Sequence, residues 1–338
     1  MRILGIETSC DETAAAVVVD GVMVESSVIA STKDIFKAVG GVVPEDAARR
    51  QLEYIIPAIR QALSDANVTQ EAIDVIAVTK GPGLLGSLLG GTTAARVLSS
   101  VWQKPLVGVH HTFGHLTSPW LAPNPRPNFP CITLSASGGH TDLWYRTSHT
   151  KGTLLGRTRD DAAGEAFDKG AKLLGLPYPG GPSIANAADA GNEAAHMFPV
   201  ALRNEDTFDF SFSGVKTALR TALHALPDLD EQARCDIAAS YQYALCHQLT
   251  DRAAAAAKTY RDAVEVHIVG GVSANRRLRS LLTETLSIPI VWPATLQYCT
   301  DNAAMIASGA AFLIEELGES AYAPFDTTAT LPLESCVS

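Results

Sequence analysis

The segment His110-His111-Thr112-Phe113-Gly114-His115 concentrates three of the chain's nine histidines within six residues. Its position predicts the end of a strand and the start of a short helix. On a helix, His111 and His115 lie four residues apart and project from one face, so both imidazoles can bind the same metal ion. A single histidine would more often cap a helix or pack locally, but the paired spacing favours a metal. A third ligand must come from elsewhere in the chain.

The same histidine spacing occurs in the metallopeptidase motif H-E-x-x-H, in which a glutamate activates water. Here Thr112 follows His111, and no glutamate lies between the two histidines. A peptidase is therefore a disfavoured alternative.

Two turns rich in small and hydroxyl residues follow predicted strands. One spans Glu7 to Thr13 and contains Asp11 and Glu12, and the other spans Ser137 to Thr141. Such turns let backbone N–H groups and hydroxyls approach phosphate or carboxylate oxygens closely. Each turn alone is compatible with a simple hairpin, but their equivalent positions in two similar halves favour a ligand.

Gly81-Pro82-Gly83-Leu84-Leu85-Gly86 matches the dinucleotide-binding pattern G-x-G-x-x-G. A dinucleotide site also requires an acidic residue at the end of the next strand. That strand ends at His110 and His111 instead, so the segment is interpreted as a strand-to-helix turn. No P-loop motif occurs.

The elements expected around these motifs repeat one βββαβαβα plan. Hydrophobic periodicity predicts strands at 2–8, 13–20, 22–29, 73–79, 105–109, 131–136, 140–146, 152–157, 264–269 and 288–292, and helices at 44–66, 84–102, 161–174, 214–223, 231–258, 275–286 and 302–317. This order resembles the α/β fold of the actin, sugar kinase and chaperone ATPase superfamily, with two lobes and a ligand in the cleft between them.

The expected domains are an N-terminal lobe at 1–129, a C-terminal lobe at 130–301 and a tail at 321–338. The helix within 302–320 is expected to pack back on the first lobe. The end of the tail, from Leu331, is expected to be poorly ordered.

Composition limits the class of protein. A chain of 338 residues with 46% hydrophobic content can form real cores, and no apolar run is long enough for a membrane helix. Six cysteines without a C-x-x-C pair are typical of a reducing compartment, so we expect a cytoplasmic protein without membrane association. The net charge of −10 disfavours RNA binding by the chain alone. The basic clusters Arg49-Arg50 and Arg276-Arg277-Arg279 are interpreted as solvated helix faces.

The chain is also similar to the tRNA threonylcarbamoyltransferase (TsaD) family. The resemblance extends in one order from the first residues to about Met305, and its motifs are GIETSCDET, GGVVPE, GPGL, H-H-x-x-G-H, SGGHT, DDAAGEAFDK, YPGGP, DFSFSGVKT, GGVSANR and CTDNAAM. It implies transfer of a threonylcarbamoyl group from threonylcarbamoyl-AMP to N6 of the adenosine 3′-adjacent to the anticodon, in tRNAs reading codons that start with A. It also implies one divalent metal per chain, with Fe²⁺ favoured over Zn²⁺, bound by His111, His115 and Asp301.

The resemblance assigns further residues to the substrate. The loop Ser135-Ala136-Ser137-Gly138-Gly139 would bind phosphate and carboxylate oxygens, and Asp168, Gly181 and Asn275 would hold the adenosine moiety. Read without the motif, Asp168 is a surface acid paired with Lys169 or Lys172. Asp11 and Glu12 are candidates for a catalytic role, and Glu12 is preferred.

Two departures from the family pattern stand out. Ala185 replaces an acid found in many members a few residues after PGGP, and Phe113 replaces a commonly acidic residue in the histidine box.

The resemblance implies a TsaB-like paralogue and a TsaE-like ATPase as protein partners. The apolar faces at 52–63 and 98–102 are candidate docking surfaces, although core packing also explains them. The alternative function is a regulatory ATP-binding module whose metal only stabilises the fold.

Overall fold

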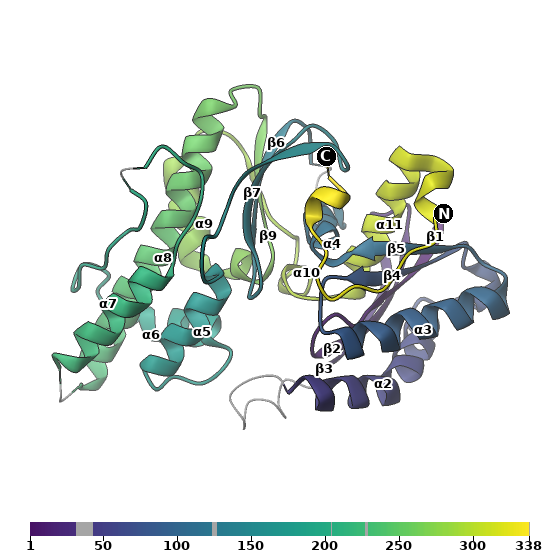
Figure 1. Cartoon of the computed structure of the whole chain (residues 1–338), viewed down its shortest axis with the longest axis horizontal. Coiled ribbons are helices and arrows are strands. Elements are labelled where there is room, and N and C mark those ends of the chain that lie inside the picture. The colour runs from purple at the N-terminus through teal and green to yellow at the C-terminus, as the bar shows by residue number, and fades with distance from the viewer. Residues whose placement is uncertain (32–42, 124–126, 204, 227–228, 338) are drawn as a thin grey trace. The chain divides into compact units, whose positions relative to one another are not determined.

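A computed structural model describes residues 1–31, 43–123, 127–203, 205–226 and 229–337 (Figure 1). Gly40–Val42 of the GGVVPE motif lie outside these residues. The chain forms two compact units. Unit 1 comprises Met1–Pro127, Ser148–Gly152 and Pro293–Ser338, and unit 2 comprises Asn128–Thr147 and Thr153–Trp292.

The sheet of unit 1 has five strands in the order β3-β2-β1-β4-β5. They are β1 (Arg2–Glu7), β2 (Glu12–Val19), β3 (Met23–Ser31), β4 (Val75–Gly81) and β5 (Leu106–His110). β1, β2 and β3 pair antiparallel, whereas β4 joins β1 and β5 in parallel. The parallel strands β1, β4 and β5 therefore present their carboxyl ends at one edge.

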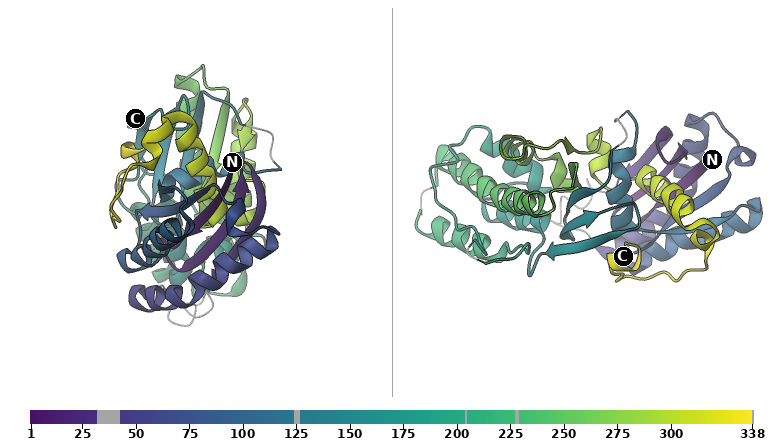
Figure 2. Two further views of the ribbon diagram at one scale, coloured as in Figure 1. Left: turned by 90° about the vertical axis from the view of Figure 1, so that its right-hand side faces the viewer. Right: turned by 90° about the horizontal axis from the view of Figure 1, so that it is seen from above.

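Helices cover both faces of this sheet. α2 (Pro44–Asp65) and α3 (Leu85–Trp102) lie side by side on one face, as Figure 2 shows, and α11 (Ala303–Leu317) packs on the other face and against α4 (His111–Thr117). Side chains alternate along β1, so Leu4 and Ile6 face α2 while Gly5 faces α11. A Cβ on Gly5 would lie 2.2 Å from the Ala303 carbonyl oxygen. Glycine is thus what permits α11 to pack directly on β1.

Unit 2 repeats the plan with a sheet in the order β10-β9-β6-β7-β8. Its strands are β6 (Cys131–Ala136), β7 (Thr141–Arg146), β8 (Gly152–Arg157), β9 (Glu265–Val269) and β10 (Ile290–Val291). The order β8-β7-β6-β9-β10 in unit 2 corresponds to β3-β2-β1-β4-β5 in unit 1. In both sheets the first strand pairs in parallel with the fourth, β1 with β4 and β6 with β9. The duplicated plan is confirmed.

The helices of unit 2 enclose a hydrophobic core on one face of its sheet. They are α5 (Ala163–Leu173), α6 (Gly180–Ala188), α7 (Ser213–His224), α8 (Glu231–Thr259) and α9 (Arg276–Thr285). α8 begins at the N-cap Asp230, whose carboxylate accepts from the Ala233 N–H. α6 was not expected, because its Gly-Gly-Pro start lacks a helical pattern. None of the described helices combines the length and apolar character needed to cross a membrane.

Short helical segments complete the described chain. They are α10 (Leu296–Cys299) and the 3₁₀ turns Gln70–Ala72, Ser118–Trp120, Gly271–Ala274, Gly318–Tyr322 and Leu333–Ser335.

The unit boundary differs from the expected one at residue 301, because Pro293–Asp301 group with unit 1. In that segment Gln297 Nε2 donates to Ser27 Oγ at 3.0 Å, which ties α10 to β3. Asp301 therefore belongs to the same unit as the two histidines, and not to the opposite lobe.

The end of the tail is packed, contrary to expectation. The Thr328 N–H donates to the Lys80 carbonyl at 2.9 Å, and the Leu331 carbonyl lies 3.0 Å from His110 Nε2. Leu333 and Val337 are buried. This packing could not be predicted from the sequence, because the segment has no periodic hydrophobic pattern.

Candidate functional site

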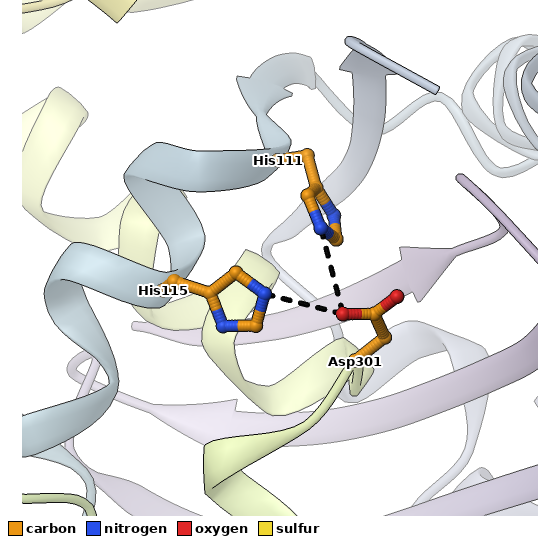
Figure 3. Close-up of side chains that lie close together, drawn as sticks. All are labelled: His111, His115 and Asp301. Atoms are coloured by element: carbon orange, nitrogen blue, oxygen red, sulfur yellow. Dashed lines mark hydrogen bonds and ion pairs between the residues drawn. The ribbon is translucent and has the colours of Figure 1, made fainter. Parts of the chain in front are cut away.

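His111, His115 and Asp301 converge in unit 1, and their ligand atoms all lie within 4.8 Å of one another (Figure 3). Asp301 Oδ1 is 3.1 Å from His115 Nε2 and 3.5 Å from His111 Nε2. The two imidazole rings meet edge to face, with centroids 4.8 Å apart and an interplanar angle of 86°. Both Nε2 atoms therefore point at one carboxylate oxygen.

Local structure explains this convergence. His111 and His115 lie one turn apart on α4, at the carboxyl end of β5. His110 is not part of the cluster, because its Nδ1 accepts from the Thr112 N–H and caps α4. Asp301 lies just before α11, whose N-cap Asn302 accepts from the Met305 N–H. Two capped helix starts thus position the ligands, with the histidines on α4 and Asp301 directly before the N-cap of α11.

These donors fit a divalent metal ion. Two nitrogen ligands and one oxygen ligand at about 2.0–2.2 Å from a metal lie roughly 3.0–3.4 Å apart around a four- or six-coordinate ion. The separations of 3.1 and 3.5 Å from Asp301 Oδ1 to the two nitrogens are close to that range. His115 is 2% exposed, and its Nδ1 is a buried atom with no hydrogen-bond partner among the described residues.

Glu7, at the end of β1, contacts the ring nitrogen of His111 that does not face Asp301. Its Oε2 lies 3.1 Å from His111 Nδ1 and accepts from Thr79 Oγ1 at 2.6 Å, while Oε1 accepts from the Ser9 N–H at 2.5 Å. Ser9 Oγ is a further neighbour of His111 Nδ1, at 3.0 Å. A carboxylate on Nδ1 favours the tautomer that leaves Nε2 free for a metal.

The pKa of His111 reflects this surrounding charge. Burial lowers the pKa, but the carboxylates of Asp301 and Glu7 raise it more, so that it is raised to about 9. A metal at this site would therefore replace a bound proton.

Glu7 and Ser9 belong to the turn predicted to face a ligand, but their contacts with His111, and the part played by Thr79, were not predicted. Glu7 could have been noticed in the sequence, because it directly follows the apolar strand segment Ile3–Ile6. A carboxylate at the end of a buried strand needs a hydrogen-bond or ionic partner.

The acidic candidates are both buried: Asp11 ends the turn after β1, and Glu12 is the first residue of β2. Glu12 is close enough to contribute to the raised pKa of His111. Asp11, Asp301 and Glu12 also raise the pKa of Cys10, after the larger effect of burial. The first turn and the histidine cluster therefore form one acidic environment within unit 1.

The segment Ser135–Gly139 comprises the last two residues of β6 and the start of the turn that follows it in unit 2. Ser137 Oγ accepts from the N–H groups of Gly139 and His140 at 3.3 and 3.2 Å, which shapes a tight turn. Cβ atoms on Gly138 and Gly139 would meet nothing within 4 Å. The loop thus has open space on the side where the glycines lack side chains.

Asp168 and Gly181 lie close together in unit 2. Asp168 Oδ1 accepts from the Gly180 N–H at 2.7 Å, and a Cβ on Gly180 would lie 2.5 Å from the Asp168 Cα. Gly181 faces open space at the start of α6. Among the described residues Asp168 forms no ion pair with Lys169 or Lys172, so the surface-pair interpretation was wrong. Burial, partly offset by the Gly180 N–H, raises the pKa of Asp168.

The Asn275 side chain is engaged within the fold. Its Oδ1 accepts from the Leu278 N–H at 3.1 Å and caps α9, and its Nδ2 donates to Gln242 Oε1 at 2.8 Å. Among the described residues, the other hydrogen of its Nδ2 group has no hydrogen-bond partner.

Comparison with known proteins gives a consistent result. The model of the TsaD family, described as tRNA N6-adenosine threonylcarbamoyltransferase, matches residues 23–308. A protein of that name from Symbiobacterium thermophilum is 49% identical over 314 residues, covering 92% of this chain and 91% of its own length. Another from Thermomicrobium roseum is 46% identical and covers 98% and 97%.

Solved structures show the same fold at low sequence identity. The alignment with HypF of T. kodakarensis covers 95% of this chain and 48% of the HypF chain, at a TM-score of 0.61 and 15% identity. Component A of (R)-2-hydroxyglutaryl-CoA dehydratase from Acidaminococcus fermentans aligns with 91% and 96% at a TM-score of 0.53 and 16% identity. These likenesses confirm the expected α/β fold of the actin and sugar kinase type.

Proposed function

Because this chain belongs to the tRNA N6-adenosine threonylcarbamoyltransferase family, we propose that it modifies tRNA at the adenosine 3′-adjacent to the anticodon. The donor is threonylcarbamoyl-AMP, and the acceptors are tRNAs reading codons that start with A. The family match over residues 23–308 carries the proposal, and the convergence of His111, His115 and Asp301 supports it.

The reaction exchanges one acyl bond for another. The adenosine N6 attacks the carbamoyl carbon, the bond from that carbon to the phosphate oxygen breaks, and AMP leaves with the electron pair. N6 loses one proton in the process. The protein must therefore orient a weakly nucleophilic amine, accept or relay its proton and bind the phosphate that departs.

One divalent metal held by His111, His115 and Asp301 would supply Lewis-acid stabilisation of developing negative charge. The mixed nitrogen and oxygen donors suit both Fe²⁺ and Zn²⁺. We favour Fe²⁺ on the family resemblance. Glu7 would keep His111 oriented for either ion.

The remaining candidates divide between the two units. Glu12, with Asp11 as its neighbour, would orient the attacking amine or take its proton. In unit 2, the Ser135–Gly139 loop would receive phosphate and carboxylate oxygens in its open space. Oδ2 of Asp168 has no hydrogen-bond partner within the described part of the chain and suits a ribose hydroxyl. The backbone of Gly181 suits a close approach of the adenosine, and Asn275 would add a contact through its amide.

Protein partners belong to this proposal. A chain with a net charge of −10 repels RNA at long range, so partners that share the RNA contact would help. A TsaB-like paralogue and a TsaE-like ATPase are the proposed partners. Exposed apolar side chains on α2 and α3 offer the paralogue a surface, since Leu52 is 63% and Val101 70% exposed. A tRNA substrate places the reaction in the cytoplasm.

The test is a reconstitution of the reaction. Threonylcarbamoyl-AMP, unmodified tRNA and the two partners are mixed with the wild-type chain or with His111→Ala, and modified adenosine is quantified by nucleoside mass spectrometry. Metal content is measured on the same preparations. We expect His111→Ala to lose both bound metal and product. Failure of the wild type to form product under any condition would instead favour a regulatory ATP-binding module.

A further inference from the structure

A cationic groove of about 520 Å³ lies between α5 and α7 of unit 2. Lys169, Lys172 and Leu173 line it from α5, and Lys216, Thr217 and Arg220 line it from α7. Four of the six lining residues are cationic and none is acidic. On a chain with a net charge of −10, such a local excess of positive charge requires an explanation.

The four cations fall into two pairs. Lys169 and Lys216 are anchored on Asp161, with Nζ to carboxylate distances of 2.7 and 3.2 Å, and Lys169 also pairs with Glu165. Lys172 and Arg220 are exposed and form no ion pair with any described residue. Asp161 thus positions two ammonium groups at the groove. The charges of Lys172 and Arg220 are not neutralised by a carboxylate of the described residues and are available to a ligand.

The basic cluster Arg276-Arg277-Arg279, which the sequence shows, differs from the groove because each of its arginines is engaged within the fold. Arg276 pairs with Asp189 at 2.5 Å, and Arg277 makes two 2.8 Å contacts to Glu193. Arg279 donates to the Ser273 carbonyl and lies over the Trp292 ring. These arginines support the fold of unit 2, so the groove, and not α9, has cations available to a partner.

We propose that this groove binds the phosphate backbone of the tRNA substrate. The inference rests on the proposed function, and it adds where the RNA contacts the chain. Phosphates attract unpaired lysine and arginine side chains by charge and release condensed counterions on binding. The aliphatic stems of the lysines and Leu173, which is 38% exposed, provide an apolar wall for sugars.

The groove is also close to a proposed substrate residue. Asp168 and Lys172 are one helical turn apart on α5, which corresponds to about 6 Å along the helix axis. Asp168 contacts the start of α6, whereas Lys169 faces Asp161 and the α7 side. Residues four apart project from the same side of a helix, so the proposed donor contact at Asp168 and the proposed RNA contact at Lys172 would lie one turn apart on α5.

The experiment measures tRNA binding by the assembled complex as a function of salt. Lys172→Ala combined with Arg220→Ala removes the two unpaired cations from exposed positions. The matched control is Lys258→Ala combined with Arg261→Ala, which removes one lysine and one arginine from exposed positions of unit 2 outside the groove. We use unmodified tRNA transcripts and compare dissociation constants between 50 and 300 mM salt.

We expect the groove variant to weaken tRNA binding roughly 5- to 50-fold and to reduce the slope of log affinity against log salt by about 1.5. In turnover, KM for tRNA should rise while kcat and AMP binding stay at wild-type values. Equal losses in the groove variant and the control, or no loss in either, would overturn the groove. If wild type binds tRNA through the groove yet forms no modified adenosine, the groove stands and the proposed function fails.

Discussion

The carboxylate of Glu7 lies 3.1 Å from Nδ1 of His111, on the opposite side of the imidazole ring from Asp301. Both carboxylates are held in place by the fold, Glu7 by Thr79 and Ser9 and Asp301 by the capped start of α11. The imidazole is therefore fixed from both ring nitrogens. A metal ion entering at Nε2 meets a ligand that is already oriented.

Glu7→Gln tests this orientation. One of the two carboxylate oxygens becomes an amide nitrogen, which cannot accept from Thr79 or Ser9, and the negative charge behind His111 is lost. We expect metal affinity to fall about 10- to 100-fold, measured by competition with a chelator. Glu53→Gln on α2, an exposed position, is the control. Unchanged affinity would show that Glu7 does not position His111.

Gly5→Ala tests the packing of α11 on β1. The added methyl would lie 2.2 Å from the Ala303 carbonyl oxygen, so the start of α11 must move. We expect a loss of about 1–3 kcal/mol in the free energy of unfolding, together with weaker metal binding because Asp301 moves with the helix.

Thermal unfolding and metal titration check both effects of Gly5→Ala. Gly214→Ala is the control, because a Cβ there meets nothing within 4 Å and the position is helical. A Gly5→Ala protein as stable as wild type would contradict the close approach of α11.

Asp168→Asn separates the substrate residues from the metal. The amide oxygen can still accept from the Gly180 N–H, but the charge available to a ribose hydroxyl is lost. We expect AMP to bind about 10-fold more weakly by calorimetry, while metal content stays at the wild-type level. Asp251→Asn, an exposed acid on α8, should change neither quantity. Normal AMP binding by Asp168→Asn would remove Asp168 from the nucleotide site.

The lowered pKa of Glu265 implies that the free energy of unfolding of unit 2 depends on pH. Burial raises its pKa, but hydrogen bonds from His267 and Asn128 lower it more, to about 2 from an ordinary value of 4.5. Because the folded pKa lies below the unfolded one, the carboxylate stabilises the fold above pH 4.5, and this stabilisation is lost as the pH falls toward 2. Cys131 and Arg146 are the other titratable groups that act on His267, whose pKa is raised.

Glu265→Gln should therefore lower the free energy of unfolding by about 1–3 kcal/mol at pH 7. The difference from wild type should shrink as the pH falls from about 4.5 toward 2, because the carboxylate of the unfolded wild type is protonated first and that of the folded protein last. Urea denaturation at several pH values measures this. Glu284→Gln, a surface acid of α9, should cost little at any pH. A constant difference across the range would contradict the lowered pKa.

The sequence predicted what depends on local pattern. Hydrophobic periodicity placed the long helix α8 within one residue of its observed end at Thr259, and the i, i+4 spacing paired His111 with His115. It could not predict α6, whose Gly180 and Gly181 disfavour a helix, although Gly180 allows close packing on Asp168. That helix exists because of tertiary contact.

Features assembled from distant segments were also missed. Glu7 and His111 are separated by 104 positions, and the groove combines Lys172 with Arg220 from two helices. No window of local sequence contains either pair. The boundary at residue 293 was missed for the same reason, since the link from Gln297 to Ser27 spans nearly the whole chain.

Because unit 1 combines segments from both ends of the chain, it cannot be completed until synthesis of the chain is almost finished. Its sheet is made from the first residues, but α11, which covers one face of that sheet, begins at Ala303. Unit 2 is complete in sequence by Trp292 and can form while it is being synthesised. The face of β1 that awaits α11 stays uncovered until then, so a chain truncated before residue 303 is exposed to aggregation and proteolysis.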